Sequence, residues 1–222
     1  MLKYALAIVA KDMRVEFRTR YALNALLMFA LVTLAAVSFT TSSSSSLAGD
    51  PNLLSALLWI VLFFSTMTGA ARSFVAEEDS HTAPLLRLGA AGAVVYWGKF
   101  LGNLMLLLVL AAVTFPLYVF LMRTGFGNLG LHIIGIVLGA IGLSGGATIV
   151  AAIVAQSAVR GALFTALSFP VLLPFLALAI QINAAAFAGF PLAEVTSQVM
   201  GLVAYSGVLI TASVLLFDFV WR

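Results

Sequence analysis

The chain has 222 residues, of which 63% are hydrophobic and only 9% are charged, and its mean hydropathy is +1.16. Soluble domains have about 45–50% apolar and about 25% charged residues, so this chain has too few charges to cover a water-exposed surface. Lipid must therefore be the solvent for much of the surface. Because cysteine is absent, disulfides, thiolate catalysis, iron–sulfur clusters and cysteine-ligated zinc are excluded. The net charge of +3 does not indicate nucleic-acid binding, since the basic residues lie between apolar runs.

The first twenty residues predict an amphipathic helix on the membrane surface. At helical spacing, one face holds the apolar residues Leu2, Leu6, Val9, Met13 and Phe17. Another arc holds the cations Lys3, Lys11, Arg14 and Arg18, with Asp12 and Glu16 between the two faces. We expect the apolar face to enter the acyl boundary and the cations to meet anionic headgroups. The helix is either a topology anchor alone or also a contact for a cytoplasmic partner. No removable signal peptide is expected, since the apolar stretch Tyr4–Ala10 is short and lacks a cleavage pattern.

Six further stretches are long enough to span a hydrocarbon core, which takes about 20 residues of helix. Each is nearly free of charge inside, as lipid requires. They are Ala22–Thr41, Leu53–Ala76, Gly98–Met122, His132–Gln156, Gly161–Asn183 and Thr196–Val220. The sequence therefore predicts an all-α, multi-pass membrane protein with a single domain over residues 1–222.

The distribution of Lys and Arg predicts the orientation, because these residues accumulate on the cytoplasmic side. With six spans, ten of the eleven fall on one side: Lys3, Lys11, Arg14, Arg18, Arg20, Arg72, Arg87, Lys99, Arg160 and Arg222. Only Arg123 falls on the other side, together with the serine-rich loop Ser42–Ser46 and the connection Ala184–Val195. Both termini are therefore expected in the cytoplasm.

The longest cytoplasmic connection, Glu77–Lys99, is the candidate site of coupling to a partner subunit. Thr82 is expected to cap a short helix that admits Pro84 in its first turn, and the acids before it suit the positive end of the helix dipole. Consecutive carboxylates point in different directions, which argues against a metal site. The acids either form a solvated flank or dock on a basic surface of another subunit. The candidate coupling residues are Glu77, Glu78, Asp79, Thr82, Pro84, Leu85 and Arg87.

Small residues and prolines inside the spans predict where helices pack and bend. Four glycines share one face of the fourth span and allow another helix to approach, either within the chain or at a subunit seam: Gly135, Gly139, Gly142 and Gly146. Pro116, Pro170 and Pro174 each remove a backbone donor, so kinks are expected there. In lipid the freed carbonyls need partners, and we expect these sites to face protein.

Several absences restrict the function. No phosphate-binding loop of the GxxxxGK[ST] type occurs, and no HExxH or GxSxG motif is present. No charged residue or histidine lies near the middle of a span, where ion-coupled carriers usually have one. His81 and His132 are at predicted membrane edges, where polar anchoring is favoured over haem ligation. The chain is therefore not expected to be an enzyme, to bind a metal or cofactor directly, or to work alone as a carrier.

Four ordered segments resemble the haem exporter protein B family, CcmB. They are Lys11-Asp-Met-Arg14-Val-Glu16-Phe-Arg18, Arg72-Ser-Phe-Val-Ala-Glu77-Glu-Asp-Ser-His-Thr82, Tyr96-Trp-Gly-Lys99-Phe-Leu-Gly-Asn103 and Phe169-Pro170-Val-Leu-Leu-Pro174. The similarity covers essentially the whole chain. Family members often have glycine before the threonine of the loop and proline after it, whereas here His81 precedes Thr82 and Gly89-Ala90-Ala91 follows.

The resemblance implies a permease subunit of ABC-2 type in the bacterial inner membrane, acting in haem export or haem-chaperone release for cytochrome c maturation. It implies a separate cytoplasmic ABC ATPase and other membrane subunits that handle haem, which is a ligand of the complex and not a resident cofactor. A homo-oligomer is left open. The alternatives are a permease of another ABC-2-type exporter and a membrane assembly factor that does not transport.

Overall fold

The computed structural model describes residues 2–19, 21–42, 49–79, 81–155 and 160–221, and within these ranges the regular structure is helical with no β-strand. The helices are α1 (Leu2–Thr19), α2 (Tyr21–Ser42), α3 (Pro51–Asp79), α4 (Ala83–Gly89), α5 (Gly92–Met122), α6 (Leu129–Ala155), α7 (Arg160–Phe187), η1 (Leu192–Val195) and α8 (Thr196–Val220). The prediction of an all-α fold is confirmed. From position 43 onward the serine-rich loop predicted at Ser42–Ser46 lies outside the described residues.

Five stretches of the described residues are long and apolar enough to cross a membrane. They are Pro51–Asp79, Gly92–Met122, Leu129–Ala155, Ser168–Phe187 and Leu192–Val220. These stretches correspond to the last five predicted spans. The first predicted span, Ala22–Thr41, forms α2, whose described apolar stretch is the shorter Asn24–Phe39. The chain is thus a multi-pass membrane protein with five candidate spans, and the sixth stays a prediction.

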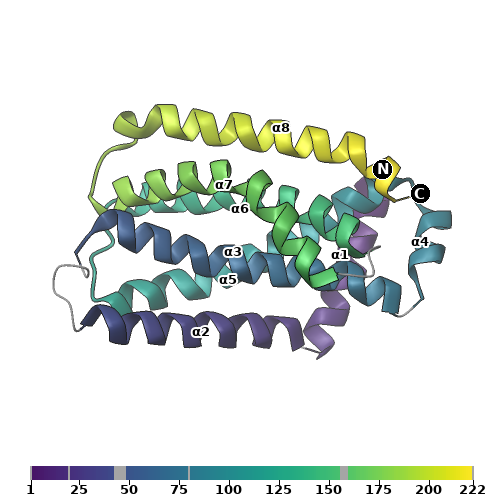
Figure 1. Ribbon diagram of the computed structural model, residues 1–222, viewed down its shortest axis with the longest axis horizontal. Helices are drawn as coiled ribbons and strands as arrows, with labels where there is room; N and C mark the ends of the chain where they lie inside the picture. The colour runs from purple at the N-terminus through teal and green to yellow at the C-terminus, as the bar shows by residue number, and fades with distance from the viewer. Residues whose placement is uncertain (1, 20, 43–48, 80, 156–159, 222) are drawn as a thin grey trace.

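The long helices lie side by side, with α8 along one edge of the bundle and α2 along the other (Figure 1). The central element is α6, which contacts α3, α5, α7 and α8. Among the candidate spans α6 is the most buried and α8 the most exposed. The glycines of α6 explain this central position, because a helix without bulky side chains can be approached closely from several directions.

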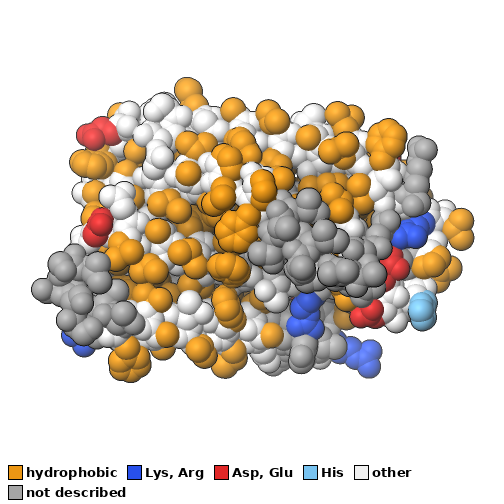
Figure 2. Space-filling model, in the orientation of Figure 1, with side chains coloured by type: hydrophobic (Ala, Val, Ile, Leu, Met, Phe, Trp, Pro, Cys, Tyr) orange, Lys and Arg blue, Asp and Glu red, His pale blue; other side chains and the backbone are white. Residues whose placement is uncertain are grey.

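Both chain ends, α1 and α4 lie at one end of the bundle, which we call the α4 end (Figure 1). The α5–α6 and α7–α8 connections lie at the opposite end. Figure 2 shows hydrophobic side chains along the visible face, with acidic and basic side chains gathered toward the two ends. This distribution suits a membrane bundle, because charges are costly within hydrocarbon.

The N-terminal helix has a protein-facing side that the sequence analysis did not predict. Ala5, Ile8 and Val9 are buried, and α1 packs on α5, with Ile8 lying directly over Gly98. Leu6, expected on the same apolar face as Val9, is instead 50% exposed. Besides the predicted apolar face, α1 thus has a second side that docks on protein, because Ala5 is small and Gly98 has no side chain. The position of α1 at a membrane surface stays a prediction.

The prolines inside α5 and α7 were expected to face protein, and this prediction is wrong. Pro116, Pro170 and Pro174 are all on exposed sides of helices that continue through them. A long helix curves around a core with its convex side outward, and a proline ring on that side avoids a clash within the bundle. A neighbouring helix still supports the backbone here, because the Tyr205 hydroxyl donates to the carbonyl of Val171 at 2.8 Å. The ribbon of α7 changes direction along its length (Figure 1).

Candidate functional site

The turn that ends α3 fixes the start of the candidate coupling loop. The amide of Thr82 donates to the Glu77 carbonyl at 3.0 Å, and the amide of His81 donates to the Glu78 carbonyl at 3.1 Å. These two bonds are the pattern of a Schellman motif, which places its C′ residue in the left-handed region. His81 occupies that position with φ 55°, where glycine is the usual residue. The chain therefore turns sharply away from α3 despite the missing glycine.

Glu77 points into the protein and not toward solvent. Its side chain is nearly buried, and its Oε1 accepts from the Lys99 ammonium at 2.9 Å and from Lys11. Its Oε2 accepts from the Thr82 hydroxyl at 2.5 Å. Thr82 precedes α4 but makes no side-chain cap on it, so the expected N-cap bond is wrong. The physical reason is that the backbone of Thr82 is in the right-handed helical region (φ −92°, ψ −13°) and not in the β region typical of an N-cap residue, so its hydroxyl is directed to Glu77.

Lys99 is 2% exposed, and its ammonium uses all three of its hydrogens. It lies 2.9 Å from the Ser73 carbonyl, 2.9 Å from Glu77 Oε1 and 2.9 Å from Asp12 Oδ2. The partners come from α3 and α1, while Lys99 itself belongs to α5. We call Lys11, Asp12, Glu77 and Lys99 the charge cluster. Its two ammonium groups and two carboxylates balance, which removes the large cost of an uncompensated buried charge.

Lys11 closes the charge cluster from α1. Its ammonium reaches Glu77 and lies 3.4 Å from Asp12 Oδ1, while much of its side chain stays accessible. Burial alone lowers the pKa of Lys11, but the hydrogen bond to Glu77 and the nearby charge of Asp12 outweigh it and raise the pKa above its ordinary value. The other predicted cations of this helix, Arg14 and Arg18, are exposed. Within the described part of the chain no three acidic or histidine side chains are arranged to hold a metal ion.

The short helix α4 has one side against the bundle and another in the open. Pro84 lies in its first turn, and Leu86 packs against the hydrophobic core. Leu85 and Leu88 are 69% and 88% exposed. Two accessible leucines on one short helix, next to charged residues, form an apolar contact point at the α4 end.

Arg87 ties α4 to two other helices. Its guanidinium donates to Glu78 Oε1 of α3 at 2.9 Å and lies over the ring of Trp221, 5.0 Å from the centroid. Trp221 directly follows α8 and is buried against Phe74 and Phe217. The position of α4 is thus held by an ion pair on one side and a cation–π contact on the other.

A second buried polar cluster lies toward the opposite end, and it carries no carboxylate or ammonium. Its centre is Asn183 of α7, whose Oδ1 accepts from the Trp59 indole at 3.2 Å and whose Nδ2 lies 2.9 Å from His132 Nδ1. We call Trp59, His132 and Asn183 the neutral cluster. The His132 ring packs against Phe115 and Phe187, with centroids 4.9 and 4.3 Å away. His132 was expected as an anchor at a membrane edge, and it is instead fully buried between helices.

The four glycines of α6 face side chains of this same chain. A methyl group added at Gly139 would overlap the Trp59 ring, and one added at Gly135 would overlap the Asn183 amide. Additions at Gly142 and Gly146 would meet Phe175 and Leu172 of α7. The glycine face is therefore filled by α3 and α7, with Ser206 of α8 also close to Gly142, and it brings the neutral cluster together.

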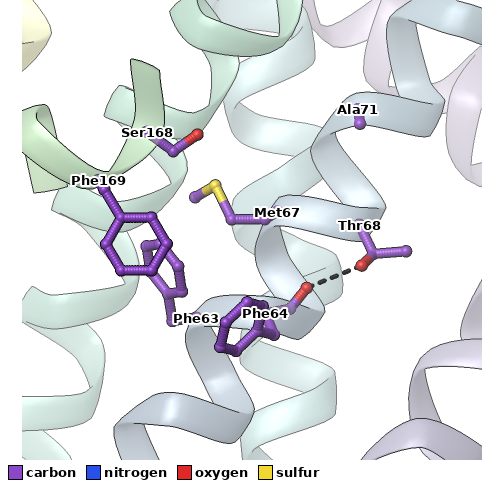
Figure 3. A pocket seen from close by; sticks show the side chains of 7 residues that line it. All are labelled: Phe63, Phe64, Met67, Thr68, Ala71, Ser168 and Phe169. Atoms are coloured by element: carbon purple, nitrogen blue, oxygen red, sulfur yellow. Dashed lines mark hydrogen bonds between the residues drawn. The ribbon is translucent and has the colours of Figure 1, made fainter. Parts of the chain in front are cut away.

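A cleft of about 170 Å³ lies between α3 and α7 (Figure 3). Phe63 and Phe169 meet across it edge to face, with ring centroids 5.7 Å apart. Met67 points toward Ser168, and the Thr68 hydroxyl donates to the carbonyl of Phe64 within α3 (Figure 3). The lining holds no charged side chain. The cleft adjoins the proline-containing part of α7, and its polar side chains are Thr68 and Ser168.

The structure separates the three acids that the sequence placed together. Glu77 is in the charge cluster, Glu78 is paired with Arg87, and Asp79 is exposed. They do not act as one solvated flank, because α3 continues to Asp79 and its helical turn sends the three carboxylates in different directions. Sequence reasoning missed the pairing of Asp12 with Lys99. A partial signal was present, since Lys99 is the second residue of a predicted span, where a lysine either reaches the interface or pairs with an acid.

The comparison with known families accounts for most of the chain. The family model described as CcmB protein matches residues 3–216. The match includes the charge cluster, α4, the neutral cluster and the proline-containing part of α7. No curated protein matches the chain. The extent of the family match identifies the chain as a member of the CcmB family.

Proposed function

We propose that this protein is the transmembrane permease subunit of an ABC complex acting in haem export or haem-chaperone release for cytochrome c maturation. Membership of the CcmB family and the five apolar spans support this role. In the proposal α2 is the sixth span, α1 lies at the membrane surface, and the α4 end faces the cytoplasm of a bacterial cell. Haem is handled by the complex, and this chain holds no resident cofactor.

The observation that carries the proposal is the exposed pair Leu85 and Leu88 on a short helix that the rest of the molecule holds in place. Arg87 fixes α4 against α3 and α8, and the charge cluster fixes its first turn through Thr82. A rigid element with accessible leucines suits an apolar groove on a soluble partner. We assign that groove to a cytoplasmic ATPase subunit, whose nucleotide-driven movement would push on α4.

The test is co-purification of the chain with the ATPase subunit of the same complex in mild detergent. Leu85→Ser combined with Leu88→Ser should abolish co-purification, because both contacts are lost while the core is untouched. The matched control replaces two exposed leucines at the opposite end, Leu129→Ser and Leu192→Ser, and should leave it intact. Full ATPase binding by the α4 variant would contradict the proposed docking site. A stable complex of membrane subunits without any ATPase would instead favour an assembly factor.

The orientation is tested separately by labelling in this cysteine-free chain. Gly89→Cys at the α4 end and Ala193→Cys at the opposite end place thiols at two exposed positions. In intact cells an impermeant thiol reagent should modify only the second variant, and in inverted membrane vesicles only the first. Modification of both from the same side would overturn the proposed topology.

A further inference from the structure

We propose that Lys99 is a positioning residue that joins α1 to α4, so that the N-terminal helix and the short helix behave as one rigid unit. The joining of the two helices is independent of the proposed function. The further statement that a nucleotide-driven partner moves this unit rests on the proposed function. The inference assigns α1 a part in transmission, beyond anchoring the chain.

Asp12 connects α1 to Lys99. Asp12 lies on the side of α1 that packs on α5, and its carboxylate meets the Lys99 ammonium at 2.9 Å. Lys11, the next residue along α1, reaches Glu77 of α3. Two adjacent residues of α1 thus bind oppositely charged groups on two different helices. Both contacts are at least partly shielded from water, and a shielded charge pair is stronger than one on an exposed surface.

Glu77 and Thr82 connect Lys99 to α4. Glu77 shares one oxygen with the two lysines and uses the other to accept from Thr82, the residue directly before α4. The Thr82 amide also donates to the Glu77 carbonyl. A displacement of the first turn of α4 therefore pulls on Glu77, and through the lysines on α1. Because Lys99 has no spare hydrogen, it cannot follow α4 without releasing Asp12 or the Ser73 carbonyl.

Spin labels on the protein alone, in lipid nanodiscs, test whether the two helices are joined. The labels are carried by Ala10→Cys on α1 and Gly89→Cys on α4, both exposed, and a side chain at Gly89 meets open space. We expect one narrow distance peak. The neutral variant Asp12→Asn, Glu77→Gln, Lys99→Met removes both carboxylate charges and every contact of the Lys99 ammonium without leaving a buried charge unpaired, and it should lose that narrow peak.

Two controls separate joining from folding. Glu78→Gln removes the other ion pair of α4 without touching the charge cluster, and it should keep the narrow α1–α4 peak. A second label pair, Ala10→Cys with the exposed Met105→Cys of α5, should stay narrow in the neutral variant, because Ile8 still packs on Gly98. An unchanged α1–α4 peak in the neutral variant would overturn the inference, and so would an equal loss in Glu78→Gln.

The complete complex tests the shared movement. Labels at Gly89 and at Ala10 are each paired with Ala193→Cys at the opposite end, and ATP is added to the complex with its ATPase. Both distances should shift together in the otherwise unaltered chain, and only the Gly89 distance should shift in the neutral variant. A shift of α4 without α1 in the unaltered chain contradicts the inference. If neither distance shifts, the proposed function fails, and the measurements on the protein alone still decide whether Lys99 joins the helices.

Discussion

The charge cluster and the neutral cluster both join three helices through buried polar groups, but they use different chemistry. Lys99 and its partners lie at the α4 end and rely on full charges at 2.9 Å. Trp59, Asn183 and His132 lie inside the bundle and rely on neutral hydrogen bonds of 2.9 to 3.2 Å. Charges can be tolerated near an end, where water is close, whereas deep in a membrane bundle they are costly.

The difference indicates two roles. The charge cluster holds α1, α3 and α5 together through balanced buried charges at the end of the bundle where α4 lies, so it suits a region that moves as one piece. The neutral cluster is surrounded by Phe115, Phe187 and the glycine face of α6, where a broken bond finds no substitute. The neutral cluster therefore suits a region in which α3, α6 and α7 keep their relative positions.

The largest effect is expected for Lys99→Met alone. Removing one member of a buried ion pair typically costs about 3–5 kcal/mol. In this variant Asp12 and Glu77 share the single ammonium of Lys11, so one negative charge is left without a counter-ion. Thermal unfolding in detergent should show a clear loss of stability. Combining Lys99→Met with Glu77→Gln should restore most of it, and Arg14→Met, at an exposed cation, should change little. Equal losses in the single and double variants would show that the cluster contributes packing and not charge balance.

The next largest effect is expected at the neutral cluster. Gly139→Ala places a methyl group on the Trp59 ring, and overpacking of this kind typically costs about 1–3 kcal/mol. The matched control is Gly207→Ala of α8, whose added methyl group meets open space. Unfolding midpoints of the two variants give the comparison. A stable Gly139→Ala protein would mean that α3 and α6 can separate without harm.

A smaller effect is expected for Arg87→Gln. The variant loses the pair with Glu78, worth about 0–1 kcal/mol at a partly exposed site, and the contact with Trp221, worth about 0.5–2 kcal/mol. Global stability should change little, while limited proteolysis at the α4 end should become faster. The control Arg123→Gln at the opposite end should leave that cleavage rate unchanged. Unaltered cleavage in Arg87→Gln would show that α4 is held by its apolar contacts alone.

The smallest effect is expected for His81→Gly. A non-glycine residue in the left-handed region costs about 1–2 kcal/mol, part of which is offset by the entropy that glycine loses on folding. The variant should be equal to or slightly more stable than the unaltered protein in thermal unfolding, with ATPase binding preserved. A marked loss of stability would reveal a contact of the imidazole that the turn geometry does not require.

The sequence predicted the helices well, because hydrocarbon imposes a simple rule on length and charge. The five spans from Leu53–Ala76 onward each correspond to an observed helix; the last has the bounds of α8, and the other helices start or end a few residues away from the prediction. The central glycine face could also be predicted from its spacing. The first predicted span is the exception, because the described apolar stretch of α2, Asn24–Phe39, is shorter than a full span.

The candidate site was predicted only in outline. The position of the short helix and Pro84 in its first turn follow from local rules. The charge cluster does not, because Asp12, Glu77 and Lys99 are far apart in sequence and meet only when α1 docks on α5. Likewise Trp59 and Asn183 carry no local pattern that pairs them. Tertiary contacts between distant residues decided what these polar side chains do.

The most direct test of the account compares ATP hydrolysis in complexes that carry one altered cluster each. The first variant, Glu77→Gln with Lys99→Met, should still bind the ATPase through α4 but fail to change its hydrolysis rate. The second, Trp59→Phe with Asn183→Leu, should yield less folded protein while each assembled complex hydrolyses ATP at the unaltered rate. The account is contradicted if the first variant retains full coupling, or if the second loses coupling in complexes that are fully assembled.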